Sequence, residues 1–176
     1  MVAGLTTFVL LDTDSDSSSV RPTPDGSTCA VRVEPAASDD EAPVFQVPGL
    51  DGGCIDLADF RGRPVLLNFW ASYCTPCRDE FPLLKQAQEQ HRDDDLAVIG
   101  VSFRDIDDDA RAFADDQDAS WLLGFDDTGD VGKAYGVRPI PQTFFINRDG
   151  TISSHLFQAF HTKKELEQEL QPILAS

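Results

Sequence analysis

The strongest chemical signal in the chain is the tetrapeptide Cys74-Thr75-Pro76-Cys77. It follows an apolar run that ends at Trp70 and precedes a helical pattern. This order places Cys74 at the N-terminus of a helix, where unpaired backbone N–H groups and the helix dipole favour a negative charge. The thiolate is the reactive form of cysteine, and Cys77 lies one turn further on, where it can close a disulfide with Cys74. The spacing therefore predicts dithiol/disulfide exchange with another molecule.

Two alternatives compete with this prediction. A CxxC pair can be half of a structural zinc site, which needs two further cysteine or histidine ligands. The other cysteines, Cys29 and Cys54, lie 25 positions apart, and His91, His155 and His161 show no zinc-finger spacing, so we interpret the histidines as surface residues. An inert structural disulfide is disfavoured because a bridge at a helix end is exposed and reducible. We therefore expect no metal and no cofactor.

Cys29 and Cys54 leave two possibilities open. They could form a structural disulfide that closes a loop of about 25 residues and stabilises the fold by roughly 3 kcal/mol in the chain-entropy model. They could equally be two unpaired, buried cysteines. A disulfide would favour an extracytoplasmic location, since such bridges persist in oxidising compartments.

The composition of the chain is strongly acidic. Its 176 residues include 31 acidic and 14 basic side chains, giving a formal net charge of −17, and only 4 of the basic residues are lysine. Nucleic acid is excluded as a partner, because phosphate binding needs clustered positive charge. An acidic, lysine-poor surface is similar to that of proteins from salt-loving microbes, in which ions screen the self-repulsion.

The composition also divides the chain into an extension, residues 1–42, and a single domain, residues 43–176. Residues 1–11 are mostly apolar but too short to span a bilayer, so they are either a short strand or the remnant of an anchor that starts upstream. The acidic, serine-rich residues 12–19 are typical of a flexible tether. This order favours an extracytoplasmic domain with a possible membrane tether at its N-terminus, and a cytoplasmic location is the alternative.

The secondary-structure signals around the CxxC motif alternate between strand and helix. A buried strand, a helix and a second buried strand form a right-handed crossover, and Pro82 should kink the helix. Together the signals predict a mixed sheet with helices on both faces. The expected segments are hairpin strands at 44–47 and 54–57, a helical turn at 57–63, strands at 64–70 and 96–103, helices from 74 to 91 and from Asp107, an extended run at 120–125, a short helix at 129–135, strands at 142–146 and 151–157, and a last helix with a Thr162/Glu165 capping box.

With these segments placed, residues 42–174 resemble thioredoxin-fold proteins of the TlpA/ResA type. The resemblance implies an α/β, thioredoxin-like fold: a central mixed sheet flanked by helices, with an N-terminal β-hairpin and a βα insertion after the first βαβ unit. It also implies a thiol-disulfide oxidoreductase that is membrane-tethered or secreted and often serves cytochrome c maturation. The motifs that carry it are Asp51-Gly52 with LADFRG from Leu57, VLLNFWA from Val65, CTPCRDEFP from Cys74, and YGVRPIPQTFFI from Tyr135.

The resemblance assigns roles to the residues of the motif. Cys74 is expected to be the nucleophile, and Cys77 the resolving thiol that attacks the mixed disulfide. Thr75 and Pro76 between them would tune the reduction potential. Pro141, which follows Ile140, matches the family's cis-proline, with an ordinary trans proline as the alternative.

Further residues are assigned to substrate binding and to proton transfer. By the same resemblance, the backbone of Ile140 would pair with the substrate chain like an added strand, while Trp70 and Tyr73 would form the apolar wall. Glu80 matches a carboxylate of this branch that could move the proton of Cys77 and raise the thiol pKa values. A solvent-facing helical glutamate is the alternative. Asn68 stands where ordinary thioredoxins carry a buried aspartate, which shifts interest to Glu80.

The leading functional hypothesis is a reductant of disulfides in extracytoplasmic proteins, with apocytochrome c as one candidate. Its partners would be protein thiols and disulfides and an upstream electron donor such as a membrane thiol-disulfide transporter. An oxidase that inserts disulfides into secreted proteins is the main alternative. A copper-handling Sco-like chaperone is disfavoured by the two-residue cysteine spacing, and a peroxiredoxin by the sequence before Cys74.

Overall fold

The computed structural model describes residues 21–22 and 28–176. The apolar residues 1–11 and the acidic residues 12–19 lie outside the described part, so the expectations for an anchor and a tether stay predictions. Within the described residues, no helix has both the length and the apolar character needed to cross a membrane.

A five-stranded mixed sheet forms the centre of the domain, in the order β10-β9-β6-β7-β8. β6, β7 and β8 are parallel to one another, whereas β9 pairs antiparallel with β6 and with β10. Every residue of β6 and β7 is buried, as expected for strands that are covered on both faces. The strands span Val65–Trp70 (β6), Ala97–Phe103 (β7), Leu122–Asp126 (β8), Gln142–Ile146 (β9) and Ile152–Leu156 (β10).

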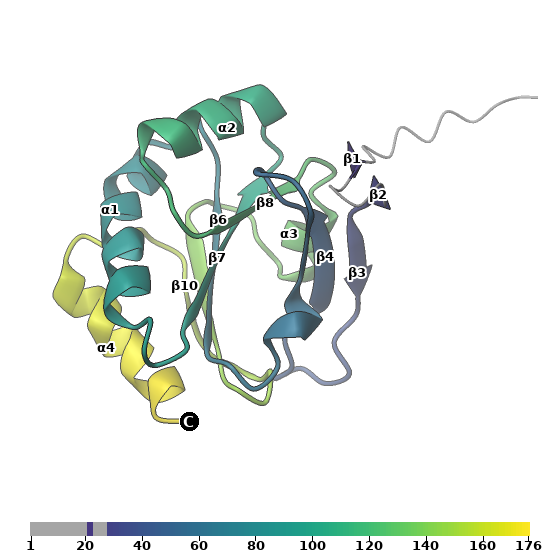
Figure 1. The fold of residues 1–176 in the computed structure, drawn as a ribbon. Helices are drawn as coiled ribbons and strands as arrows, with labels where there is room; N and C mark the ends of the chain where they lie inside the picture. Colours follow the sequence, from purple (N-terminus) through teal and green to yellow (C-terminus); the bar gives the residue numbers. More distant parts are fainter. Residues whose placement is uncertain (1–20, 23–27) are drawn as a thin grey trace, which may run out of the picture.

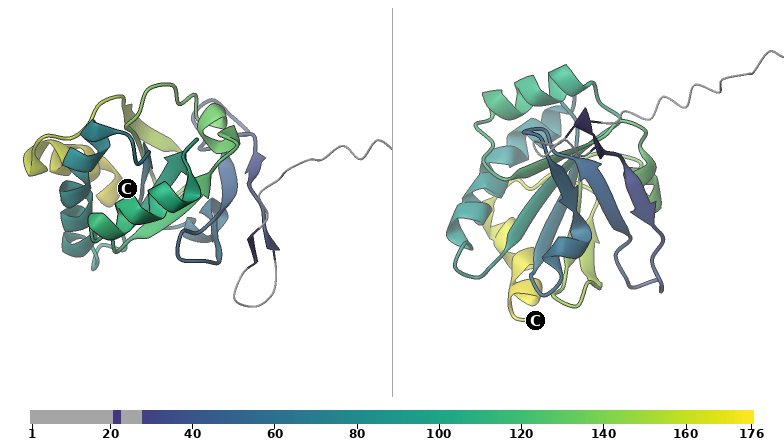
Figure 2. Two further views of the ribbon diagram at one scale, coloured as in Figure 1. Left: turned by 90° about the horizontal axis from the view of Figure 1, so that it is seen from above. Right: turned by 45° about the vertical axis from the view of Figure 1, so that its right-hand side comes forward.

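The two faces of this sheet are covered by different elements (Figures 1 and 2). Three helices pack on one face: α1 (Thr75–Gln90), α2 (Asp107–Asp116) and α4 (Lys163–Leu174). The other face is covered by the short α3 (Asp130–Ala134), the 3₁₀ turn η1 (Leu57–Phe60) and a three-stranded sheet of β3 (Arg32–Glu34), β4 (Val44–Pro48) and β5 (Cys54–Asp56). The thioredoxin-like fold expected from the sequence is therefore confirmed.

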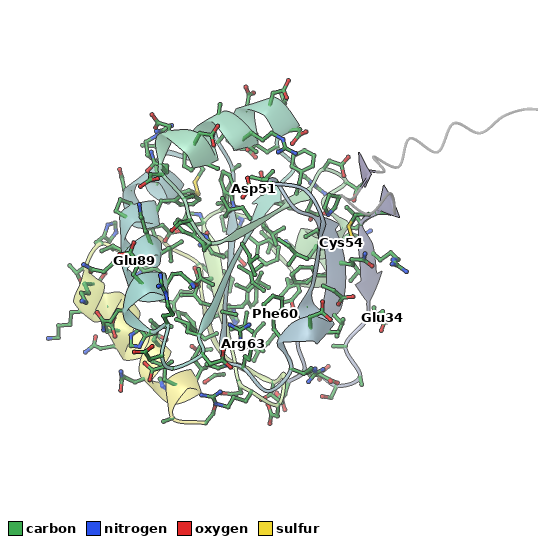
Figure 3. All side chains as sticks on the ribbon, in the orientation of Figure 1. Glu34, Asp51, Cys54, Phe60, Arg63 and Glu89 are labelled. Atoms are coloured by element: carbon green, nitrogen blue, oxygen red, sulfur yellow. A yellow bond between two sulfur atoms is a disulfide. The ribbon has the colours of Figure 1, made fainter. Side chains whose placement is uncertain are left out.

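The N-terminal segment joins the domain earlier than residue 43. β1 (Arg21–Pro22) and β2 (Thr28–Cys29) form a small antiparallel pair, and β3 adds to β4. A disulfide links Cys29 to Cys54 on β5, which settles the open question about these two cysteines (Figure 3). Strand pairing of residues 32–34 and the cross-link at Cys29 connect this segment to the domain, and the boundary at residue 42 stays a prediction.

Two helix predictions can be compared in detail with the structure. The capping box of α4 is present: the Thr162 hydroxyl accepts a bond from the Glu165 N–H, and the Glu165 carboxylate accepts from the Thr162 N–H. His91, which we expected on the surface, is only 6% exposed. Its ring bonds to Asp94 at 2.7 Å and to Glu167 at 2.9 Å, so it ties the end of α1 to α4. His155 and His161 are exposed, as expected.

Candidate active site

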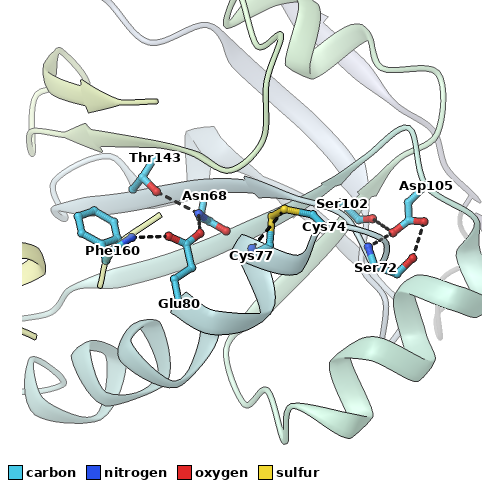
Figure 4. Close-up of a disulfide and its surroundings, with 9 residues drawn as sticks. All are labelled: Asn68, Ser72, Cys74, Cys77, Glu80, Ser102, Asp105, Thr143 and Phe160. Atoms are coloured by element: carbon cyan, nitrogen blue, oxygen red, sulfur yellow. Dashed lines mark hydrogen bonds between the residues drawn. A yellow bond between two sulfur atoms is a disulfide. The ribbon is translucent and has the colours of Figure 1, made fainter. Parts of the chain in front are cut away.

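The CxxC motif lies where the chain leaves β6 and enters α1. The N–H of Cys74 donates to the carbonyl of Ala71 at 3.1 Å, which closes a turn between the strand and the helix. Cys74 is the N-cap residue of α1, with φ −88° and ψ 102°, and it is joined to Cys77 by a disulfide (Figure 4). The strand-to-helix arrangement predicted from the sequence therefore places the sulfur of Cys74 at the positive end of the helix dipole.

The two sulfurs have different surroundings. Cys74 is 6% exposed and Cys77 is 0% exposed, so an incoming reagent reaches Cys74 first. The Sγ of Cys74 accepts a hydrogen bond from the backbone N–H of Cys77 at 3.2 Å. After reduction, the same N–H group can stabilise a thiolate on Cys74, because hydrogen bonds to the charged form favour that form.

A carboxylate fixes the turn in front of Cys74. Asp105, just beyond the end of β7, accepts from the Ser72 N–H at 2.5 Å and from the Ser72 hydroxyl at 2.8 Å. It also accepts from the Ser102 hydroxyl at 3.3 Å and from the Ile106 N–H at 2.8 Å. Asp105 therefore links the turn that presents Cys74 to the end of the neighbouring strand and the start of α2 (Figure 4).

Asp105 was not identified from the sequence, although a signal for it exists. β6 and β7 are parallel, and Trp70 pairs with Ser102 in their register. The carboxyl ends of parallel strands meet at one edge of the sheet, where α/β proteins place their sites. A polar residue three positions after Ser102 is therefore a candidate neighbour of the CxxC turn.

The loop before β9 supplies the other side of the site. The peptide bond between Ile140 and Pro141 is cis, as the resemblance implied. Ile140 is partly buried, and no hydrogen bond joins its backbone to another part of the described chain. Tyr73, next to Cys74, is 67% exposed. Tyr73 and the backbone of Ile140 can therefore both be reached by a polypeptide that approaches the disulfide.

Trp70 does not occupy the position that we expected. It is 0% exposed and packs against Phe81 and Phe113, with ring centroids 5.0 Å away in both cases. The side chain points to the helical face of the sheet because β6 alternates, and α1 and α2 cover that face. Trp70 therefore supports the site from the core and cannot contact a substrate in this state, whereas Thr75 and Pro76 are exposed beside the disulfide.

Glu80 is fully buried, which excludes the alternative of a solvent-facing glutamate. One carboxylate oxygen accepts from Asn68 Nδ2 at 2.8 Å, and the other accepts from the backbone N–H of Phe160 at 3.1 Å. Burial raises the pKa of Glu80 to about 7, although the bonds from Phe160 and Asn68 act in the opposite direction. Cys77 and Glu80 lie three residues apart, on the same face of α1.

Asn68 can pair with either protonation state of Glu80. Its Nδ2 donates to Glu80 and to the Thr143 hydroxyl at 3.0 Å, while its Oδ1 is buried without a partner among the described residues. Rotation of the amide by 180° would exchange the two atoms, so that Oδ1 could accept from a protonated Glu80 and from the Thr143 hydroxyl. The backbone N–H of Phe160 gave no signal in the sequence, because only the tertiary fold brings it to Glu80.

The described residues contain no group of three histidine, cysteine, aspartate or glutamate side chains that could hold a metal ion. The site therefore consists of a surface-accessible sulfur, a buried sulfur, a buried carboxyl group that titrates near neutral pH, and a loop with a cis-proline. This arrangement can exchange a disulfide with a polypeptide and move one proton within the protein.

Comparison with known proteins agrees with this chemistry. The AhpC/TSA family model matches residues 38–155. The thiol-disulfide oxidoreductase ResA of Bacillus thuringiensis subsp. konkukian is 33% identical over 133 residues, which are 76% of each chain. The chain belongs to the ResA-like thiol-disulfide oxidoreductases of the AhpC/TSA family. The thioredoxin-like protein YneN of Bacillus subtilis is 37% identical over 74% of this chain and 76% of its own length.

Solved structures extend the comparison to the fold of this ResA-like protein. A thiol:disulfide interchange protein named DsbE from Chlorobium tepidum superposes with a TM-score of 0.72 at 34% identity, covering 77% of this chain and 96% of that chain. A secreted Mycobacterium tuberculosis disulfide oxidoreductase, homologous to E. coli DsbE, has a TM-score of 0.67 at 24% identity, over 73% and 95% of the two chains. The second likeness shows the shared fold alone.

Proposed function

We propose that this thiol-disulfide oxidoreductase is a reductant of disulfides in extracytoplasmic proteins. The assignment as a reductant rather than an oxidant rests on the buried carboxyl group of Glu80, which lies on the same helix face as Cys77. A negative charge close to a dithiol raises the thiol pKa values and disfavours the thiolate. Strong oxidants work in the opposite way, because their reduced form is stabilised.

The proposed reaction starts from the reduced protein. The Cys74 thiolate attacks one sulfur of the substrate disulfide, which forms a Cys74–substrate disulfide and releases the first substrate thiolate. Cys77 then transfers its proton to the Glu80 carboxylate and attacks the sulfur of Cys74. The second substrate thiolate leaves, and the Cys74–Cys77 disulfide seen in the structure is formed. Two electrons pass from the protein to the substrate.

Other residues would position the substrate. The backbone of Ile140 would pair with the substrate chain in the manner of an added strand, and Tyr73 would provide an exposed apolar contact. Asp105 would hold the turn that presents Cys74. An upstream donor, such as a membrane thiol-disulfide transporter, would restore the reduced state.

The second disulfide supports a location outside the cytoplasm. Cys29 and Cys54 are bonded to each other, and structural disulfides persist in oxidising compartments. Tethering to the membrane through the N-terminus belongs to the same proposal. Apocytochrome c is the candidate substrate that the resemblance implies, since its haem-attachment motif is itself a C-x-x-C-H sequence.

The reduction potential of the Cys74–Cys77 pair tests the direction. The protein is equilibrated in thiol/disulfide buffers, and the fraction of reduced Cys74 and Cys77 is measured by alkylation and mass mapping. A reductant should give a value near about −270 mV or below. A value near about −120 mV would make the protein an oxidase and overturn the proposal.

A further inference from the structure

A groove of about 420 Å³ between the end of β7, α3 and the loop after α3 is lined by three cations and no carboxylate. Its walls are Phe103 at the end of β7, Arg104, Lys133 of α3, and the loop residues Gly136, Val137 and Arg138. Asp105, which directly follows Arg104, does not line it and instead accepts bonds from Ser72 and Ser102. Asp126, Asp127 and Asp130, which precede Lys133 in the chain, do not line it either. Asp126 is fully buried and accepts from the N–H groups of Val131 and Gly132.

These cations differ from those on α1 and α2. Arg78, Lys85 and Arg111 on α1 and α2 each pair with an aspartate. Among the described residues, no ion pair involves Arg104, Lys133 or Arg138, and all three are exposed. In a chain with 31 acidic and 14 basic side chains, a groove lined only by cations among its charged residues departs from the average surface.

Both walls of the groove continue into the segments that frame the disulfide. Arg104 directly precedes Asp105, which holds the turn in front of Cys74. Its guanidinium lies 5.1 Å from the centre of the Phe103 ring, which fixes its direction. On the other wall, Arg138 lies three residues before the cis-proline Pro141. A polypeptide that pairs with Ile140 would therefore have its neighbouring residues close to the groove.

We propose that this groove binds acidic side chains of the polypeptide substrate, on residues that flank the cysteine under attack. This proposal rests on the proposed function, because it describes the sequence around the cysteine of the substrate. Charge complementarity between the cations and acidic side chains is the reason for proposing an acidic segment as the ligand. The net charge of −17 repels an acidic partner from most of the surface, so the groove gives such a partner one favourable orientation, with its disulfide toward Cys74.

A binding experiment tests the groove without using the redox reaction. The probe is a fluorescent peptide with aspartates on both sides of two serines that replace cysteines, and the reference peptide has asparagines instead. In about 0.1 M salt, where the screening length is about 10 Å, the oxidised protein should bind the aspartate peptide roughly fivefold more tightly. One well-placed exposed ion pair of about 1 kcal/mol gives this factor.

Variants of the groove test whether its cations cause the preference for the aspartate peptide. Lys133→Gln/Arg138→Gln should abolish the preference, and Lys133→Glu/Arg138→Glu should reverse it. Lys85→Gln/Arg92→Gln removes one lysine from the second half of α1 and one arginine just after its end, neither of which lines the groove, and should keep the preference. Equal binding of both peptides by the unmodified protein, or the same loss in the control variant, would overturn the proposal.

The same peptides with an internal disulfide separate this proposal from the proposed function. Single-turnover reduction by the reduced protein should be about fivefold more efficient for the aspartate peptide. If neither peptide is reduced, the proposed function fails, and the binding result alone decides on the groove. If both are reduced equally well, the protein is a reductant and the groove does not select its substrates.

Discussion

The buried carboxyl group of Glu80 should make the stability of the protein depend on pH in a way that one substitution removes. Burial raises the pKa of Glu80 from 4.5 to about 7. The folded state therefore holds this proton more tightly than the unfolded state. The stabilising contribution is complete below about pH 4.5 and is lost as the pH rises through about 7, so the free energy of unfolding should fall across this range.

The size of the effect follows from the difference between the two pKa values. A difference of about 2.5 units at roughly 1.4 kcal/mol per unit gives about 3 kcal/mol. Glu80→Gln keeps the size of the side chain and removes the charge. Its Oε1 can still accept from the Phe160 N–H, and its Nε2 can donate to Oδ1 of a rotated Asn68. The variant should therefore be about 3 kcal/mol more stable than the unmodified protein at pH 8 and about equally stable at pH 4.

Urea unfolding of both proteins at about pH 4, 6, 7 and 8, with both disulfides oxidised, measures this difference by linear extrapolation. Glu89→Gln, an exposed position on the same helix, is the matched control and should show no such pH-dependent gain. Other titrating groups are present in every protein compared, so their contributions cancel. A difference between Glu80→Gln and the unmodified protein that does not change with pH would refute the reasoning.

Four further predictions concern the cysteines, the turn before them and the surface charge. Cys77→Ser should accumulate mixed disulfides with protein substrates on non-reducing gels, whereas Cys74→Ser should not, because only the first keeps the accessible sulfur. Replacing Cys29 and Cys54 by alanine should lower the free energy of unfolding by about 3 kcal/mol, measured in urea, without changing the potential of the CxxC pair. Asp105→Ala should slow peptide reduction and alter the pH profile of Cys74 alkylation, while Asp105→Asn, which can still accept from the Ser72 N–H, should retain most of the rate. The thermal midpoint should rise strongly from dilute buffer to about 1 M potassium chloride, where the screening length is roughly 3 Å; a flat or falling midpoint would contradict a salt-adapted surface.

The sequence was sufficient for the elements around the disulfide, because local signals determine them. Val65–Trp70 is apolar except for Asn68 and forms a strand that is buried on both faces. The side chains that cap α1 and α4 belong to short motifs, Cys74 with Cys77 and Thr162 with Glu165. In both caps the two residues lie three positions apart, so the local sequence is enough to predict the helix start.

Features that depend on distant segments could not be determined in this way. Whether Glu80 faces solvent is decided by the segment at Phe160, 80 residues away, which supplies a backbone N–H group. His91 is buried because Glu167 of α4 lies against the end of α1. The bond between Cys29 and Cys54 needs β3, β4 and β5 in register, and the sequence left their pairing open.

The burial of Glu80 connects the stability of the protein to its proposed chemistry. An exposed glutamate has a pKa near 4.3 and would be a weak acceptor for a thiol proton at neutral pH, whereas a group with a pKa of about 7 can both accept and release one. The fold produces this value by burying the carboxyl group, while the bonds from the Phe160 N–H and from Asn68 lower the pKa and limit the shift. The same burial destabilises the folded state above neutral pH. Asn68 limits that loss, because its amide can rotate to pair with either form of the carboxyl group. The partnerless Oδ1 of Asn68 is thus explained as the acceptor that the protonated state of Glu80 requires.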